Sequence, residues 1–312
     1  MKIGIDMMGG DFAPLEAVKG VKSYLNTGSP SSLCLIGDQP ILEKLLMEHG
    51  IEPSALTIQH APTVIGMNEH PTRALKEKPD SSIAVGFGLL AANKIDAFLS
   101  AGNTGAMLVG THFSIKPLEG VIRPTISTII PKADGKTGIL LDVGLNADCK
   151  PEQLNQFATM GTIYAQQILG IEEPTTGLIN VGEEEGKGNQ LAQATYPLLK
   201  ENQTIRFIGN IEGRDILKSK ADVMVCDGFT GNIILKMAES IYDIAKQQQI
   251  HNAYFDRFNF EDYGGTPILG VAKPVLIGHG ISGEKAFLNM LLLAEKMIQK
   301  DVMTTLQKAL QA

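Results

Sequence analysis

Short apolar runs alternate with longer segments of helical periodicity along most of this 312-residue chain. The apolar runs predict strands at residues 3–5, 33–36, 56–58, 97–100, 138–141, 176–181, 206–208 and 223–226. The longer segments predict helices at residues 16–25, 41–49, 82–93, 152–169, 190–200, 232–249 and 284–310. Strands that alternate with helices are typical of βα units around a largely parallel sheet, so the sequence predicts an α/β fold.

Two regions rich in Gly and Pro divide this pattern. Pro117, Pro124 and Pro131 punctuate the first region, and residues 264–274 form the second. Residues 125–130 are apolar and β-branched, which predicts a strand that joins two parts of the sheet. We therefore expect a two-part α/β architecture. The predicted parts are an outer α/β domain of residues 1–120 and 273–312 and an inserted middle α/β domain of residues 121–272.

A glycine-flanked lysine is the strongest candidate for a binding residue. Lys187 lies in the segment Gly182-Glu-Glu-Glu-Gly-Lys-Gly-Asn189, between the predicted strand 176–181 and the predicted helix 190–200. A glycine turn before a helix places backbone N–H groups beside the lysine, a combination that suits phosphate or another oxyanion. The spacing does not match a Walker A loop, which has four residues between its first glycine and its Gly-Lys. Taken alone, the segment is equally compatible with a solvated surface loop.

Four further loops place Gly with Asn, Asp or Thr directly after a predicted strand. They are residues 6–11, 100–105, 142–148 and 227–232, and the last is expected to open its helix at Asn232. Each loop by itself is explained as a βα turn in which Gly supplies positive φ and a polar residue caps the helix. Several such loops at strand C-termini favour a shared pocket. Neutral hydrogen-bonding side chains, backbone donors and one lysine together suit an oxyanion-binding site.

Other signals exclude several classes of function. The formal net charge of −7 argues against a nucleic-acid binder, which normally carries a basic face. The three cysteines are widely spaced and form no CxxC pair, which indicates reduced thiols and a cytoplasmic location. There is no signal-peptide core and no apolar run near the roughly 20 residues of a membrane span. The sequence also lacks a GxSxG elbow, an HExxH pair and a GxGxxG turn after the first strand, so we expect no metal and no cofactor.

The loops, taken in order, closely resemble those of the PlsX family, the phosphate acyltransferases of bacterial phospholipid synthesis. The resemblance is carried by residues 3–11, 100–106, 141–148, 180–189, 209–214, 227–232 and 263–265. It implies the two-part αβα sandwich of isocitrate dehydrogenases and phosphotransacetylases, an active-site cleft between the two parts, and a homodimer. It also implies conversion of acyl–acyl carrier protein and inorganic phosphate to acyl phosphate and free carrier protein. The acyl phosphate would supply a downstream glycerol-3-phosphate acyltransferase.

The family pattern falls on Lys187 and Asn232 as the most essential residues. We assign Lys187 to bind phosphate and offset developing charge, and Asn232 to orient phosphate or donate to the oxyanion. Backbone N–H groups near residues 102–105 and 186–188 would complete the cradle, while Asp142 and Asn146 would hold the loops in place. The predicted substrate-binding residues are Asn103, Thr104, Gly105, Asp142, Asn146, Gly186, Gly188, Asn189, Thr230 and Gly231.

Three other functions are alternatives for a chain with these loops. The second candidate is a phosphotransacetylase acting on short acyl-CoA, which shares the chemistry and differs in acyl pocket and carrier. A dehydrogenase on the same fold lacks a recognisable metal-ligand or nicotinamide pattern, and a non-enzymatic scaffold has no use for a lysine cradle.

Two expectations concern partners. An acidic carrier protein needs a local basic patch on this acidic chain, and the candidates are Lys236, Lys246, Arg257 and Lys273. Residues 247–261 are interrupted by Gln, Asn and charges, so we expect at most weak peripheral membrane contact. The aromatic residues there are expected to pack on a dimer partner or line the acyl entrance. They are Tyr254, Phe255, Phe258 and Phe260.

Overall fold

The computed structural model describes residues 1–311, and the chain divides into two compact units. Unit 1 contains residues 1–117, 260–267 and 271–299, and unit 2 contains residues 118–259, 268–270 and the chain from Lys300 onward. The first division lies near the expected residue 120. The last helix, α11 (Val302–Gln311), belongs to unit 2 and not to the expected outer domain, because it packs on α6 (Pro151–Tyr164).

Unit 1 is built on a parallel sheet with the strand order β3-β2-β1-β4-β11. The central strand β1 has Ile3 and Ile5 fully buried, as expected for a strand covered on both faces. The first two residues of β10 (Thr266–Leu269) pair antiparallel with β11. The strands are β1 (Lys2–Asp6), β2 (Ser32–Gly37), β3 (Thr57–His60), β4 (Ala97–Ser100) and β11 (Val275–Ile277).

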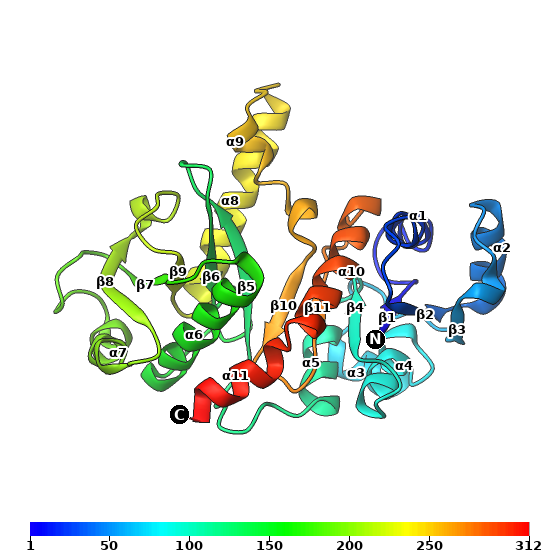
Figure 1. The fold of residues 1–312 in the computed structure, drawn as a ribbon, viewed down its shortest axis with the longest axis horizontal. Helices are drawn as coiled ribbons and strands as arrows, with labels where there is room; N and C mark the ends of the chain where they lie inside the picture. The colour runs from blue at the N-terminus through cyan, green and yellow to red at the C-terminus, as the bar shows by residue number, and fades with distance from the viewer. Residues whose placement is uncertain (312) are drawn as a thin grey trace. The chain divides into compact units, whose positions relative to one another are not determined.

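Helices cover both faces of the unit 1 sheet (Figure 1). Helices α1 and α10 pack against each other on one side, while α3, α4 and α5 form the opposite layer (Figure 1). The helices are α1 (Leu15–Leu25), α2 (Gln39–Glu48), α3 (Pro71–Glu77), α4 (Ser82–Ala91), α5 (Thr104–Ser114) and α10 (Glu284–Gln299). Short 3₁₀ turns lie at Pro53–Ala55 and Phe260–Tyr263.

The strands of unit 2 follow the order β5-β6-β9-β7-β8. β5 is antiparallel to β6, and the other pairs are parallel. Ile268 and Leu269 of β10 pair antiparallel with β5. The strands are β5 (Thr125–Pro131), β6 (Thr137–Leu141), β7 (Thr175–Asn180), β8 (Arg206–Glu212) and β9 (Val223–Val225).

The helices of unit 2 flank this sheet and one of them extends beyond it. α6 ends in a π-helical turn, Ala165–Leu169, and contacts α7 (Gln190–Glu201). α8 (Gly228–Gln247) and the short α9 (Ala253–Asp256) extend from unit 2 away from its strands (Figure 1). A 3₁₀ turn, Gly213–Asp215, follows β8.

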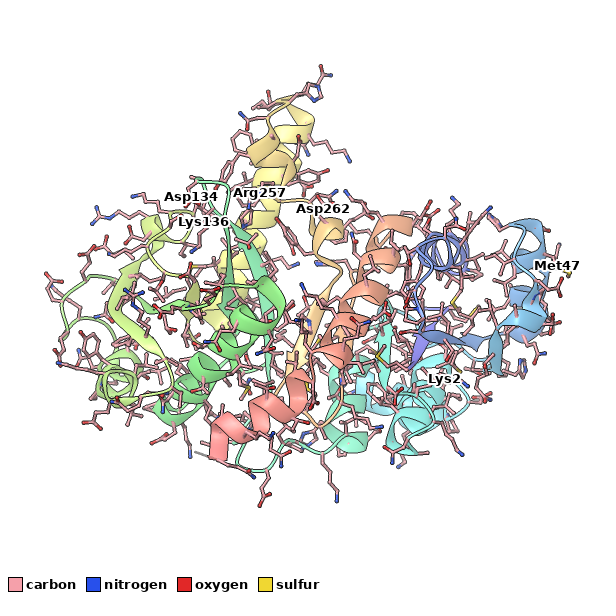
Figure 2. The ribbon with its side chains drawn as sticks, viewed as in Figure 1. Lys2, Met47, Asp134, Lys136, Arg257 and Asp262 are labelled. Carbon is pink, nitrogen blue, oxygen red and sulfur yellow. The ribbon has the colours of Figure 1, made fainter. Side chains whose placement is uncertain are left out.

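The aromatic segment after α8 packs on its own unit. The Tyr254 and Phe258 rings meet edge to face at 5.3 Å, and Phe258 is only 7% exposed. The Arg257 guanidinium donates to the backbone carbonyls of Lys132 and Lys136 in the β5–β6 hairpin (Figure 2). The expectation that Phe258 faces a partner or an acyl entrance is therefore wrong.

The α/β fold with a largely parallel sheet is confirmed, but several of its elements differ from prediction. β10 and β11 were not expected, because both are short and lie in a region rich in Gly and Pro. The expected helix 284–310 is two helices, α10 and α11, separated at Asp301, whose φ of 47° is left-handed. α8 begins at Gly228, four residues before the expected start at Asn232.

The packing of α4 generates a test of the unit 1 core. A Cβ at Gly86 would lie 2.3 Å from two ring carbons of Phe98, whereas a Cβ at Gly88 would meet nothing within 4 Å. Gly86→Ala is expected to cost about 1–3 kcal/mol through overpacking. Gly88→Ala, on the same helix, is expected to gain up to about 1 kcal/mol in helix propensity. Urea unfolding of both variants checks this pair, and equal stabilities would contradict the packing.

Candidate functional site

The candidate site of unit 2 lies where parallel strands β6, β9 and β7 end. Their carboxyl ends share one edge of the sheet, the usual position of ligands in such folds. Three segments follow those ends: residues 142–148 after β6, residues 181–189 after β7, and the start of α8 after β9. Most of the predicted site residues fall in these segments.

A buried carboxylate shapes the loop after β6. Asp142 is 0% exposed and accepts hydrogen bonds from the backbone N–H groups of Gly144, Leu145 and Asn146. The Asn146 side chain donates to the same carboxylate and to the carbonyl of Pro124 at 2.8 Å. Burial raises the pKa of Asp142, and these hydrogen bonds oppose that shift. The contacts are those of residues that hold a loop in place.

The first turn of α8 lies directly against that loop. A Cβ at Gly231 would come within 1.8 Å of the Asp142 carbonyl oxygen, and a Cβ at Gly228 within 2.6 Å of the Asn146 carbonyl oxygen. Both positions therefore need glycine for a close approach of backbones. Gly231, which the sequence suggested as a substrate contact, has a packing role of its own.

Asn232 does not cap its helix, contrary to the sequence prediction. The N-cap of α8 is Asp227, whose carboxylate accepts from the backbone N–H and the hydroxyl of Thr230, both at 2.9 Å. Asn232 lies in the second turn of α8, and its Nδ2 donates to the Val143 carbonyl at 3.2 Å. The sequence missed this start because glycines are poor helix formers, so Gly228 and Gly231 suggested a turn.

The lysine loop after β7 is held by its neighbours. The Asn180 side chain donates to the Lys187 carbonyl at 3.1 Å, and the Lys187 N–H donates to the Glu184 carbonyl at 3.0 Å. Gly188 has a φ of +96°, and a Cβ there would lie 2.2 Å from the Asn180 Oδ1. Asn189 caps α7 by accepting from the Ala192 N–H at 2.8 Å. The backbone on both sides of Lys187 is thus fixed.

The charges around Lys187 leave its ammonium group available. Glu183 pairs with Lys220 at 2.5 Å, and Glu185 pairs with Lys200 at 3.1 Å. Lys187 itself is exposed and has no acidic partner within 4.0 Å among residues 1–311. Two of the three neighbouring carboxylates are therefore occupied elsewhere, and the lysine can receive an anion.

A pocket of about 340 Å³ lies beside these segments in unit 2. It brings together two predicted residues, Asn189 and Thr230, with Asn180 and Asp227, which the sequence did not single out as binding residues. Their positions at the ends of β7 and β9 are the signal that could have found them. The pocket lining does not include the other predicted site residues of unit 2. They are Lys187, Asn232, Asp142, Asn146, Gly186, Gly188 and Gly231.

Cys226 also lines this pocket, but its chemistry argues against a nucleophile. It is 3% exposed, and burial raises the pKa of its thiol well above the ordinary value. Burial likewise raises the pKa of Cys149 to about 12, with Asp142 adding to the shift. Both thiols are therefore protonated near neutral pH, when only the thiolate is strongly reactive.

The remaining predicted site residues, Asn103, Thr104 and Gly105, belong to unit 1 at the start of α5. Asn103 caps α5, and its Nδ2 donates to the carbonyls of Gly66, Met67 and Glu69 at 2.9–3.1 Å. The amide protons of Asn103 are thus engaged within the chain. Thr104, which follows it, is exposed.

The predicted basic residues do not share one environment. Lys236 pairs with Glu239 at 2.8 Å, and Lys246 is exposed near the end of α8. Arg257 is bound to the β5–β6 hairpin, as described above. Lys273 belongs to unit 1, where burial lowers its pKa.

Within residues 1–311, no group of three or more His, Cys, Asp or Glu side chains is placed to hold a metal ion. No helix in that same part of the chain is both long and apolar enough to cross a bilayer.

The sequence and the fold of this chain are similar to those of known proteins. The sequence matches the family described as "Fatty acid synthesis protein" over residues 1–305. It is 42% identical to a phosphate acyltransferase of Dictyoglomus turgidum, an alignment that covers 97% of this chain and 95% of that protein. It is also 42% identical to a phosphate acyltransferase of Thermoanaerobacterium thermosaccharolyticum, covering 100% and 97%. The EutD phosphotransacetylase of Staphylococcus aureus shares the fold, with a TM-score of 0.63, 15% identity, and coverage of 99% and 94%.

The hydrogen bonds of Asp142 predict its contribution to stability. Asp142→Asn replaces one acceptor oxygen by an NH₂ group that faces N–H donors, and we expect a loss of about 1–3 kcal/mol in unfolding free energy. Asp148→Asn changes the same charge at an exposed position of the same loop and serves as the control. Thermal and urea unfolding measure both variants. Equal stability of the two would show that the Asp142 hydrogen bonds do not hold the loop.

Proposed function

The chain belongs to the PlsX family of phosphate acyltransferases, and from that premise we propose that it transfers acyl groups from acyl carrier protein to inorganic phosphate. The products are an acyl phosphate and free carrier protein. The acyl phosphate then supplies an acyltransferase that acylates glycerol 3-phosphate. The observation that carries the proposal is Lys187, an exposed lysine without an ion pair in a fixed glycine loop at the end of β7, as far as residues 1–311 are described.

The reaction requires that phosphate be positioned and that the negative charge on the oxyanion be stabilised as it develops. A phosphate oxygen forms a bond to the thioester carbonyl carbon, the C–S bond breaks, and the pantetheine sulfur leaves as a thiolate. Phosphate is already anionic, so it needs orientation more than deprotonation. Lys187 offsets the charge of phosphate and of the oxyanion that develops, and backbone N–H groups near Gly186 and Gly188 add neutral donors.

Asn232 has the groups that orientation of phosphate needs. One hydrogen bond of its Nδ2 goes to Val143, which aims the amide back toward the loop after β6. In the described part of the chain, no second hydrogen bond of this side chain is found, so one amide proton and the Oδ1 remain for a ligand. Asn232 therefore acts on phosphate or on the oxyanion, while Asp142 and Asn146 hold its neighbours.

A phosphotransacetylase that acts on short acyl-CoA is the second candidate. The fold shared with the Staphylococcus aureus phosphotransacetylase keeps this candidate open, because a common fold does not specify the acyl carrier. The sequence identity to the phosphate acyltransferases, 42%, favours the carrier-protein reaction.

We also propose that the enzyme is a cytoplasmic homodimer. On α8, Phe229, Ile233, Met237 and Ile244 are between 50% and 67% exposed, and their spacing places them along one stretch of the helix surface. An apolar helix face of this kind is normally covered by another element. A membrane-surface helix would instead carry Lys and Arg on its polar face, and Lys236 is paired with Glu239. Light scattering of the purified chain tests the dimer.

One assay separates the two enzymatic candidates. The purified protein is incubated with long-chain acyl carrier protein or with acetyl-CoA, with and without phosphate, and acyl phosphate is trapped as its hydroxamate. We expect phosphate-dependent product from the carrier-protein substrate. Turnover of acetyl-CoA alone would favour the phosphotransacetylase, and no product from either donor would refute both proposals.

Lys187→Ala is expected to reduce acyl phosphate formation by about 100- to 1,000-fold, the usual cost of removing an oxyanion-stabilising group. The fold is expected to survive, because the Lys187 side chain is exposed. Lys94→Ala is the control, since it removes an exposed lysine of unit 1 that lies outside these segments. Near-normal turnover of the Lys187 variant would remove this lysine from the mechanism.

Asn232→Asp is expected to damage activity at least as much as Asn232→Ala. The aspartate places a carboxylate oxygen against the Val143 carbonyl, where Nδ2 now donates, and adds negative charge beside phosphate. Ser240→Asp adds the same charge at an exposed position farther along α8 and is expected to leave turnover unchanged. Steady-state kinetics with varied phosphate measures the effect, and a fully active Asn232→Asp enzyme would make Asn232 structural.

A further inference from the structure

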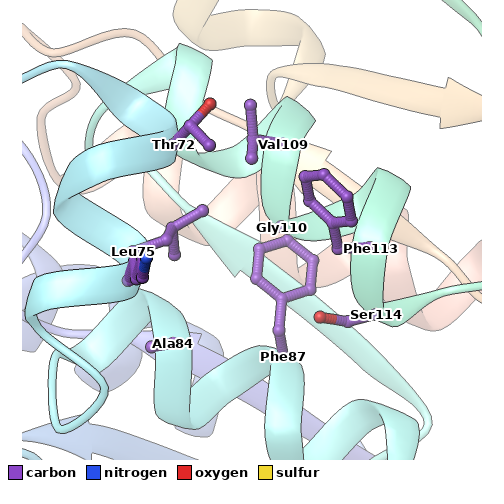
Figure 3. A pocket seen from close by; sticks show the side chains of 9 residues that line it. Thr72, Leu75, Ala84, Phe87, Val109, Gly110, Phe113 and Ser114 are labelled. Carbon is purple, nitrogen blue, oxygen red and sulfur yellow. The ribbon is translucent and has the colours of Figure 1, made fainter.

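A second pocket, of about 320 Å³, lies in unit 1 between α3, α4 and α5. Leu75, Phe87 and Phe113 point toward one another across it, with Val109 and Ala84 completing the apolar wall (Figure 3). This volume is at the lower end of the range of ligand pockets, about 300–1,000 Å³. None of these residues belongs to the site proposed above.

The wall of this pocket is rigid on one side and open on the other. Phe87 is 2% exposed and meets the Phe98 ring edge to face at 5.1 Å. A Cβ at Gly110 would lie 2.2 Å from Phe87, so α5 and α4 are in close contact there. Phe113, in contrast, is 75% exposed, although its ring faces the pocket (Figure 3). An apolar ligand that fills the pocket would cover this ring.

The polar groups of the pocket lie among its outer residues and include one cation. Lys76 lines the pocket, is exposed, and has no acidic partner within 4.0 Å in the described chain, residues 1–311. The nearest charged residues of the same helix, Arg73 and Glu77, pair with each other at 2.9 Å. Thr72 and Ser114 supply hydroxyl groups. The pocket therefore combines an apolar interior with a single unpaired positive charge and no unpaired carboxylate in its lining.

We propose that this pocket binds the aliphatic chain of an anionic amphiphile, with the hydrocarbon between Phe87, Val109 and Phe113 and the anionic head at Lys76. A hydrocarbon chain needs no hydrogen-bond partner, and the interior offers none. A charged head gains most beside a cation that no carboxylate already neutralises. A free long-chain carboxylate has this chemistry. The binding itself does not rest on the proposed function.

The pocket is connected to the loop at Asn103. Helix α5 carries Asn103 as its N-cap and Val109, Gly110 and Phe113 in the pocket wall. A Cβ at Gly105 would lie 2.3 Å from Pro71, the first residue of α3, so the start of α5 is packed on the start of α3. A ligand in the pocket would therefore contact both helices that hold this loop.

Binding is tested with cis-parinaric acid, a fluorescent polyene carboxylate, on the full-length wild-type chain below the micelle concentration of the probe. We expect saturable binding that dodecanoate displaces. Val109→Trp fills the pocket and should raise the dissociation constant about tenfold, the loss expected when two buried methylene groups are displaced. Leu89→Trp, at a half-buried position of α4 outside the lining, is the matched control. No saturable binding, or equal affinities of wild type and Val109→Trp, would overturn the proposal.

A charge reversal tests the head group without altering the core. Lys76→Glu should weaken parinarate binding more at low salt than at high salt, whereas Lys44→Glu, an exposed change in the same unit, should not. Unchanged affinity of the Lys76 variant would refute the assigned head-group contact.

Discussion

The candidate site depends on the close contact between the first turn of α8 and the loop after β6. Because Gly231 would bring a Cβ within 1.8 Å of the Asp142 carbonyl, no side chain fits between the helix and the loop. This contact leaves Asp227 free to cap the helix and brings Asn232 to the Val143 carbonyl. The position of Asn232 is therefore set by the packing of the α8 backbone against the loop after β6. It is not set by the turn that the sequence suggested.

In each unit, a buried aspartate that accepts backbone hydrogen bonds shapes a loop at the end of a strand. Asp6 after β1 and Asp142 after β6 are both fully buried, and each accepts hydrogen bonds from the backbone N–H groups that follow it. Ser100 adds a hydroxyl donor to Asp6 at 2.6 Å, as Asn146 adds an amide donor to Asp142. Burial raises the pKa of both carboxyls, and the hydrogen bonds offset part of that cost. These aspartates order the loops and need not touch a substrate.

The sequence predicts most of the fold because buried parallel strands are continuous apolar runs. It fails where local and tertiary signals conflict. β10 contains Pro267 and ends near Gly270, so its residues suggested a linker, yet pairing with β11 and β5 makes it a strand. Asp301 takes a left-handed φ without glycine, and a helical pattern cannot reveal such a break. For the site, Gly182–Asn189 identifies the lysine, but the pocket residues Asn180 and Asp227 emerge only once β7 and β9 are neighbours.

If an acidic chain is to bind phosphate, as proposed for this one, its charges must be arranged so that the anion is not repelled. The loop of Lys187 begins with three carboxylates, which in isolation would oppose an anion. Lys220 and Lys200 pair with two of them, and Lys220 also pairs with Asp215 at 3.1 Å. The Lys200–Glu185 pair is exposed, so it contributes little to stability, in the range of about 0–1 kcal/mol. The effect of these pairs is instead to draw Glu183 and Glu185 toward other lysines, which leaves the charge of Lys187 as the one in its loop without a counter-ion among the residues described.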